Sequence, residues 1–179
     1  MGTPYPNPIS PSQTRIGWIG IGVMGAAMAS RLLSAGYSLT IYARTPSKAH
    51  PLQSQGAQLA DSPFQLAQLS DVVFTMVGHP PDVRSNILDP ETGLLWGLRP
   101  NSVSVDMTSS HPALAREIFN AARTKDCWTV DAPESEEGRV AVLPGAALCK
   151  QLFSGMVANG DGKLGGQGLI TVIERLNGK

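Results

Sequence analysis

The stretch GWIGIGVMGAAMASRLLSAGY, residues 17–37, places three glycines between a short apolar run and an alanine-rich run. Gly20, Gly22 and Gly25 fit the pattern G-x-G-x-x-G, which indicates a binding loop only when a strand precedes it and a helix follows it. Both are predicted here, because residues 15–20 are apolar and the apolar residues after the glycines recur at helical spacing. The first glycine permits a tight turn, the second leaves room for a pyrophosphate, and the third lets the helix pack closely. The stretch predicts dinucleotide binding; the alternative is a purely structural glycine turn.

Apolar runs alternate with helical periodicity from Arg15 onward. Strands are predicted at 15–20, 39–44, 57–60, 72–77, 102–107 and 127–132, and helices after the glycine turn, after Thr45-Pro46, after Ser62-Pro63 and over 111–123. Pro51 is expected to shorten or kink the helix that begins after Thr45-Pro46. Such alternation predicts an α/β fold with a Rossmann-like, doubly wound parallel sheet.

The pattern changes after Pro133, where a polar run and a glycine-rich stretch replace the apolar segments. We expect a flexible leader over 1–14, a NAD(P)-binding domain over 15–133, and a divergent, poorly structured tail over 134–179. No all-α domain is predicted.

Composition excludes several classes of partner. Lys plus Arg and Asp plus Glu number 14 each, so no net charge favours nucleic acid or an anionic membrane. No apolar run approaches the roughly 20 residues that span a bilayer. The two cysteines form no framework and no metal-ligand cluster, and the leader has no basic residue, so we expect a cytoplasmic protein without a metal.

The end of the second predicted strand bears on the choice of cofactor. A site for NAD usually carries an acidic residue there, whereas here the sequence is Tyr42-Ala43-Arg44-Thr45. Arg44 can bind the 2′-phosphate of NADP bidentately, and Thr45 can add a hydroxyl. The alternative is that Arg44 is a solvated charge. We predict NADP, with NAD as the second candidate.

With these motifs the chain resembles the β-hydroxyacid dehydrogenase family, which includes 3-hydroxyisobutyrate dehydrogenase, glyoxylate/succinic semialdehyde reductase and, more distantly, 6-phosphogluconate dehydrogenase. The general look is that of plant 3-hydroxyisobutyrate dehydrogenase-like members. The family opens with G-x-G-x-M-G-x-x-M-A, has a short loop after its fourth strand, and carries D-x-[ST]-T-x-x-P, matched here over 106–112. The resemblance implies that the cofactor is held by Gly20, Ile21, Gly22, Val23, Met24, Gly25, Arg44, Thr45, Met76, Val77, Gly78 and Ser109.

The resemblance is expected to end near Pro133. The family continues D-A-P-V-S-G-G, a loop that holds the substrate carboxylate, whereas glutamates replace both glycines here. Ser135 keeps the position of the family's serine as a candidate substrate ligand, the alternative being an exposed polar loop. The family's lysine motif, G-x-x-G-x-x-x-K-x-x-x-N, is absent, so no catalytic residue is assigned. His79 and His111 could replace the lysine as acid, although a structural role is favoured for each.

Two functions remain open from the sequence. The first is the NADP(H)-binding domain of an oxidoreductase acting on small hydroxy or carbonyl acids, present here in a truncated and catalytically impaired form. The alternative is a non-catalytic NADP(H)-binding or regulatory module that associates with full-length relatives.

Overall fold

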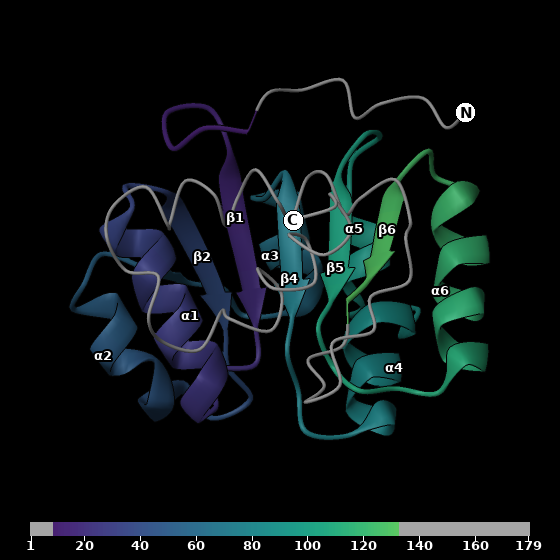
Figure 1. Cartoon of the computed structure of the whole chain (residues 1–179), viewed down its shortest axis with the longest axis horizontal. Coiled ribbons are helices and arrows are strands. Elements are labelled where there is room, and N and C mark those ends of the chain that lie inside the picture. The colour runs from purple at the N-terminus through teal and green to yellow at the C-terminus, as the bar shows by residue number, and fades with distance from the viewer. Residues whose placement is uncertain (1–8, 133–179) are drawn as a thin grey trace, which may run out of the picture.

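A six-stranded, entirely parallel sheet forms the centre of the molecule (Figure 1). The structure, a computed structural model, describes residues 9–132. The strands are β1 (Arg15–Ile19), β2 (Ser38–Tyr42), β3 (Gln58–Leu59), β4 (Val72–Thr75), β5 (Val103–Asp106) and β6 (Trp128–Asp131). Their order across the sheet is β3-β2-β1-β4-β5-β6, which is the Rossmann order.

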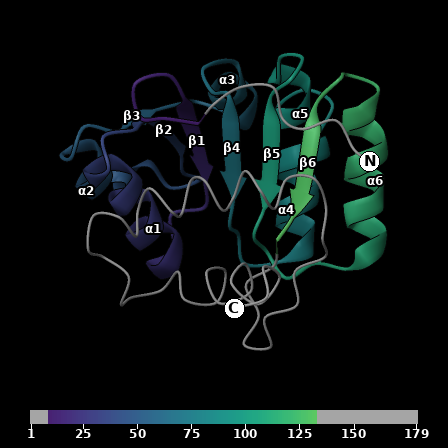
Figure 2. The ribbon, with the colours of Figure 1, turned by 45° about the horizontal axis from the view of Figure 1, so that its top comes forward.

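Helices cover both faces of this sheet. They are α1 (Val23–Ser34), the 3-10 helix η1 (Pro46–Ala49), α2 (His50–Gln53), α3 (Pro63–Gln68), α4 (Pro80–Leu88), α5 (Leu94–Gly97) and α6 (Pro112–Arg123). Figure 2 shows α1 and α2 on one side of the sheet, and one buried cluster joins their apolar residues to those of the strands. The residues of α3 to α6 share a second cluster on the opposite face. The fold is therefore the predicted doubly wound α/β domain.

The switch in strand order lies at β1, which pairs with β2 on one side and β4 on the other. Ile19 at the carboxyl end of β1 is in register with Tyr42 of β2 and Thr75 of β4. All four residues of β4 are buried, as expected for a central parallel strand. In open parallel sheets a ligand binds outside the carboxyl ends of the strands where the order reverses, so this edge is where a site is expected.

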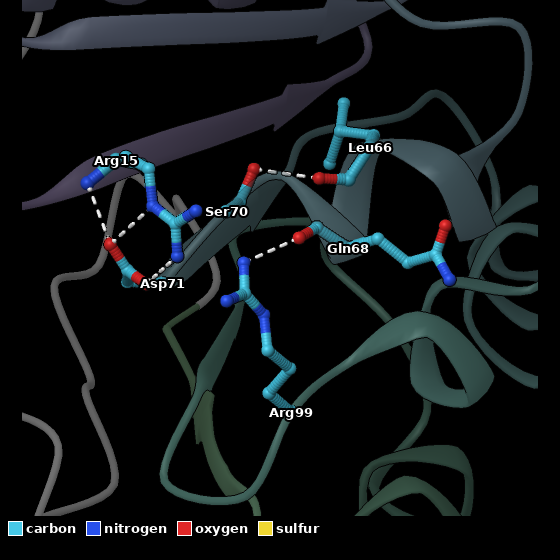
Figure 3. Close-up of polar contacts among 6 residues, drawn as sticks. All are labelled: Arg15, Leu66, Gln68, Ser70, Asp71 and Arg99. Carbon is cyan, nitrogen blue, oxygen red and sulfur yellow. Dashed lines mark hydrogen bonds and ion pairs between the residues drawn. The ribbon is translucent and has the colours of Figure 1, made fainter.

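An ion pair ties β1 to β4 at the opposite edge (Figure 3). The backbone N–H of Arg15 donates to Asp71 Oδ2 at 2.9 Å and its Nε donates to the same oxygen at 3.0 Å, while Nη2 contacts Oδ1. Burial raises the pKa of Asp71, but the hydrogen bonds from Arg15 outweigh it and hold the pKa below its ordinary value. Nearby, the Ser70 hydroxyl donates to the carbonyl of Leu66 at 2.7 Å. The contacts between Arg15 and Asp71 hold together the two strands whose other ends flank the candidate site.

The sequence predicted all six strands but not every helix. Ser62 caps α3 by accepting from the Gln65 N–H at 3.1 Å, and Pro51 lies in a helix of only four residues, both as expected. Helices α4 and α5 were missed; α4 was missed because the prolines at its start were not interpreted as a helix start. The predicted tail over 134–179, and with it the question of an all-α domain, lies outside the described residues.

Candidate dinucleotide-binding site

The three glycines after β1 have three different surroundings. Gly20 has φ +94°, and a Cβ built on it would lie 2.0 Å from the carbonyl oxygen of Met76. A Cβ on Gly25 would lie 2.0 Å from the Gly20 carbonyl oxygen, so this glycine is needed for α1 to approach the turn. A Cβ on Gly22 would meet nothing within 4 Å. The first and third glycines are thus required by the fold itself, whereas Gly22 faces open space.

A buried tryptophan holds the turn. The indole Nε1 of Trp18 donates a hydrogen bond of 3.0 Å to the Gly20 carbonyl. Its ring stacks on Phe74 of β4, with centroids 5.2 Å apart and an interplanar angle of 25°. The residue is 1% exposed, so this contact is shielded from water. Trp18 therefore fixes the carbonyl against which Gly25 packs.

The start of α1 has the properties of an anion site. Gly22 is the N-cap residue, it has extended backbone with φ −66° and ψ −174°, and no side chain caps the helix. The Ala26 N–H is bonded to the Gly22 carbonyl at 2.8 Å, and the N–H groups before it have no helical partner because they lie in the first turn. These donors and the positive end of the helix dipole suit a phosphate. The residues predicted to contact the cofactor from this turn, Val23 and Met24, are 93% and 51% exposed.

A cleft of about 290 Å³ lies at the carboxyl ends of β1, β2 and β4. Its walls are Ile19, Gly20, Ile21, Gly22, Tyr42, Ala43, Arg44, Thr45, Lys48, Met76, Val77, Gly78, Asp82, Ser85 and Asn86. The cleft joins the glycine turn, the end of β2 and the segment from the end of β4 into α4. It therefore occupies the place that the sheet topology indicates.

Most of the predicted cofactor residues line this cleft. Gly20, Ile21, Gly22, Arg44, Thr45, Met76, Val77 and Gly78 do so. Val23, Met24 and Gly25 do not line it but form the first turn of α1 beside it, and Ser109 is exposed in the loop after β5. Ser135, the candidate substrate ligand, lies outside the described residues.

Seven lining residues were not among the predicted cofactor residues: Ile19, Tyr42, Ala43, Lys48, Asp82, Ser85 and Asn86. Lys48 had a usable signal, because it is a cation only four residues after Arg44. Asp82, Ser85 and Asn86 had none, because they belong to the unpredicted helix α4. Asp82 Oδ1 lies 3.1 Å from Arg44 Nη1, so a carboxylate does stand at this end of the cleft.

The loops after β4 and β5 are tied together by a hydroxyl. The backbone N–H of Val77 donates to Thr108 Oγ1 at 3.0 Å, and the Thr108 N–H donates to Asp106 Oδ1 at the same distance. Thr108, the neighbour of the predicted Ser109, thus positions the cleft wall. His111 caps α6 by accepting from the Ala113 N–H at 3.2 Å, in keeping with its favoured structural role, and His79 is the N-cap residue of α4 with no side-chain cap bond.

Two carboxyl groups at the ends of β5 and β6 have raised pKa values. Burial raises the pKa of Asp106 to about 6, aided by the nearby Asp131, while hydrogen bonds from Thr108 and Ser110 act in the opposite direction. Burial likewise raises the pKa of Asp131. The two residues are in register and line a second cavity, of about 270 Å³, against α6. Since the folded pKa of Asp106 exceeds its ordinary value of 3.8, the ionised carboxylate destabilises the fold.

We expect Asp106→Asn to stabilise the domain at pH 8 by up to about 3 kcal/mol, the free energy of a pKa shift of about two units. The cost of the charge is fully present above pH 6 and is lost as the pH falls through the window between about 6 and 4. Urea unfolding at pH 8 and pH 4.5 measures the difference in free energy of unfolding between variant and wild type. This difference should be smaller at pH 4.5. An advantage equal at both values would contradict the assignment.

Comparison with known proteins identifies the domain. The family model described as the NAD binding domain of 6-phosphogluconate dehydrogenase matches residues 15–147. The chain belongs to the β-hydroxyacid dehydrogenase family and contains its NAD-binding domain. The resemblance found in the sequence is thereby confirmed, and so is an NAD(P) cofactor for the family's domain.

Curated relatives extend the likeness beyond the expected limit at Pro133. The probable 3-hydroxyisobutyrate dehydrogenase-like 3 of Arabidopsis thaliana, named as mitochondrial, is 38% identical over 296 positions, covering 99% of this chain and 93% of that protein. The like-2 protein of the same plant, also named as mitochondrial, is 54% identical over 151 positions, covering 81% of this chain and 50% of that protein. The first alignment is longer than the chain, so part of that relative faces gaps. The expectation that the resemblance ends at Pro133 is wrong; the domain boundary stays a prediction.

Solved structures share the NAD-binding fold. An imine reductase from Myxococcus stipitatus in complex with NADP⁺ is 32% identical, with a TM-score of 0.58 over 64% of this chain and 39% of that one. The 3-hydroxyisobutyrate dehydrogenase of Mycobacterium tuberculosis, solved with L-serine, is 28% identical, with a TM-score of 0.62 over 70% and 42%. In several of these comparisons the aligned part of the chain spans about half or less of the relative's length.

Within residues 9–132, no group of three or more His, Cys, Asp or Glu side chains is arranged to hold a metal ion. Among the helices of these described residues, none is both long enough and apolar enough to cross a membrane.

Proposed function

We propose that the chain binds NADP(H) in the cleft at the carboxyl ends of β1, β2 and β4, as the cofactor domain of an oxidoreductase acting on small hydroxy or carbonyl acids. The observation that carries this proposal is the pairing of two features in one cleft. Gly22 opens the start of α1 to a pyrophosphate, and Arg44 offers a cation at the end of the neighbouring strand. A cofactor with phosphates at both places satisfies both features.

The residues of the cleft fit the parts of the cofactor. The first-turn N–H groups of α1 would hold the pyrophosphate, and Arg44 with Thr45 would hold the 2′-phosphate of the adenosine. Lys48 adds a second cation at that end. Met76, Val77 and Gly78 form the wall on the side of β4, and Ser109 is assigned to the nicotinamide by the family resemblance alone. The cofactor, when bound, supplies the hydride.

The chemical step needs more than a cofactor. An acid must protonate the substrate oxygen, and a loop must hold the substrate carboxylate. The family's lysine motif is not found in this sequence, and glutamates stand where the substrate loop has glycines. We therefore propose that this form is catalytically impaired, with Ser135 as a remaining candidate for substrate contact. As a second candidate, we propose a non-catalytic NADP(H)-binding module that associates with full-length relatives. We also propose a cytoplasmic location, although two relatives are named as mitochondrial.

Arg44→Ala is expected to weaken NADPH binding by about ten- to a hundredfold, because a charge-assisted phosphate contact contributes roughly 1.5–3 kcal/mol. NADH binding should change far less, since NADH has no 2′-phosphate. Fluorescence titration of wild type and variant with both cofactors measures this. Wild type should bind NADPH more tightly than NADH.

Arg84→Ala is the matched control, because Arg84 is also an exposed, ion-paired arginine but lies outside the cleft, bonded to Glu117 of α6. Its NADPH affinity should equal that of wild type. Equal losses in the two variants would remove Arg44 from the site. In the same samples, NADPH oxidation with glyoxylate or succinic semialdehyde should stay at the rate without protein, and clear turnover would refute the impaired state.

A further inference from the structure

The carboxylate missing from the end of β2 is supplied by another element. Asp82 lies in the first turn of α4, and its Oδ1 is 3.1 Å from Nη1 of Arg44 at the end of β2. The two residues are 38 positions apart, and both line the cleft. The sheet order explains the meeting, because β2 and β4 flank β1 and α4 follows β4 (Figure 1).

This ion pair is poorly suited to holding the fold together. The Arg44 side chain is 83% exposed and that of Asp82 is 28% exposed, and exposed pairs of this kind contribute little to stability. Asp82 is the anchored partner. Its N–H donates to the His79 carbonyl at 2.9 Å, and its own carbonyl accepts from Asn86 Nδ2 at 2.7 Å. The backbone that carries this carboxylate is therefore fixed, whereas the exposed guanidinium of Arg44 can leave the carboxylate with little loss of stability.

We propose that Asp82 sets the balance between NADP(H) and NAD(H) in this cleft. The proposal rests on the proposed function above. A 2′-phosphate at Arg44 must displace the carboxylate from the guanidinium and is repelled by it. With NAD(H) the ion pair persists, and Asp82 offers a charged acceptor to a ribose hydroxyl, as an acidic residue on the second strand does in other folds of this kind. Arg44 favours NADP(H) and Asp82 favours NAD(H). The ratio of NADPH affinity to NADH affinity is therefore smaller than Arg44 alone would give.

Asp82→Asn tests this assignment. The amide keeps the size of the side chain but removes its charge. NADPH affinity should rise by about three- to tenfold, the effect of one nearby unit charge in a largely hydrated site. NADH affinity should fall by about threefold or more, because a charged acceptor is replaced by a neutral one. Fluorescence titrations give both dissociation constants, and thermal unfolding should be nearly unchanged.

Glu91→Gln is the matched control. Glu91 is an exposed carboxylate beyond the carboxyl end of α4, whereas the cleft lies at the other end of this helix. The substitution therefore removes the same charge as Asp82→Asn, but away from the cleft. The ratio of the two affinities should equal that of wild type in this variant.

Each outcome decides the inference. If Asp82→Asn leaves the ratio unchanged, or alters both affinities by the same factor, Asp82 does not set the preference. If Glu91→Gln shifts the ratio equally, net charge is responsible and the inference fails. If Arg44→Ala weakens NADPH binding while Asp82→Asn has no effect on the ratio, only this inference is lost. If wild type binds neither cofactor, the proposed function fails and this inference with it.

Discussion

Alanine at Gly20 is expected to destabilise the folded domain by about 3 kcal/mol or more. The residue has φ +94°, which side-chain-bearing residues rarely adopt, and the new Cβ would lie 2.0 Å from the carbonyl oxygen of Met76. That oxygen cannot move aside easily, because the Met76 N–H is bonded to the Ile19 carbonyl at 2.8 Å. Urea unfolding followed by circular dichroism measures the loss.

Gly56→Ala separates the two causes. Gly56 has φ +107°, but a Cβ on it would meet nothing within 4 Å, so this variant carries backbone strain without overlap. Its loss should be about 1–2 kcal/mol and clearly smaller than that of Gly20→Ala. Equal losses in the two variants would mean that the contact with Met76 relaxes without cost.

Valine at Gly22 is expected to weaken NADPH binding by at least about a hundredfold while the fold is retained. Its backbone is extended, and the side chain would enter open space in the cleft where the pyrophosphate is assigned. The change of N-cap residue should cost no more than about 1 kcal/mol of stability. Fluorescence titration measures the NADPH affinity, and thermal unfolding of the same preparation measures the stability.

Gly56→Ala serves again as the control, because Gly56 does not line the cleft and its NADPH affinity should equal that of wild type. A folded Gly22→Val protein that binds NADPH normally would place the pyrophosphate elsewhere. The two substitutions are thus expected to have different effects: Gly20→Ala lowers the stability of the fold, whereas Gly22→Val lowers the affinity for NADPH.

The sequence was sufficient for features whose causes are local. The tight turn at Gly20, the open position at Gly22 and the close helix contact at Gly25 could be predicted because they arise within one strand–turn–helix unit, whereas the contact of Gly20 with Met76 could not. The strands were predictable for the same reason, since each is a short apolar run between helical or turn segments. Helix α4 was missed although prolines are well tolerated in a first helical turn, where the missing N–H has no partner to lose.

Features that depend on the arrangement of distant elements could not be predicted. The meeting of Arg44 and Asp82 follows from the crossover that places β4 beside β1, and no spacing in the sequence encodes it. The hydrogen bond from Val77 to Thr108 is similar, because it depends on which hydroxyl of a Thr-Ser pair turns toward the neighbouring loop. The sequence motif over 106–112 identifies this loop, but tertiary packing decides that Thr108, and not Ser109, accepts the hydrogen bond from Val77.

The close approach of Gly20 to Met76 also constrains the order in which the site can form. During synthesis, the glycine turn emerges with β1 and α1, but the carbonyl that bounds it belongs to Met76, directly after β4, which follows only after β2 and β3. A chain that has folded only its first β-α-β unit therefore contains all three glycines and the end of β2, but it lacks the wall of the cleft that follows β4. Because pairing of distant segments is the slow part of folding, the binding site should mature late even though its recognisable motif is made first.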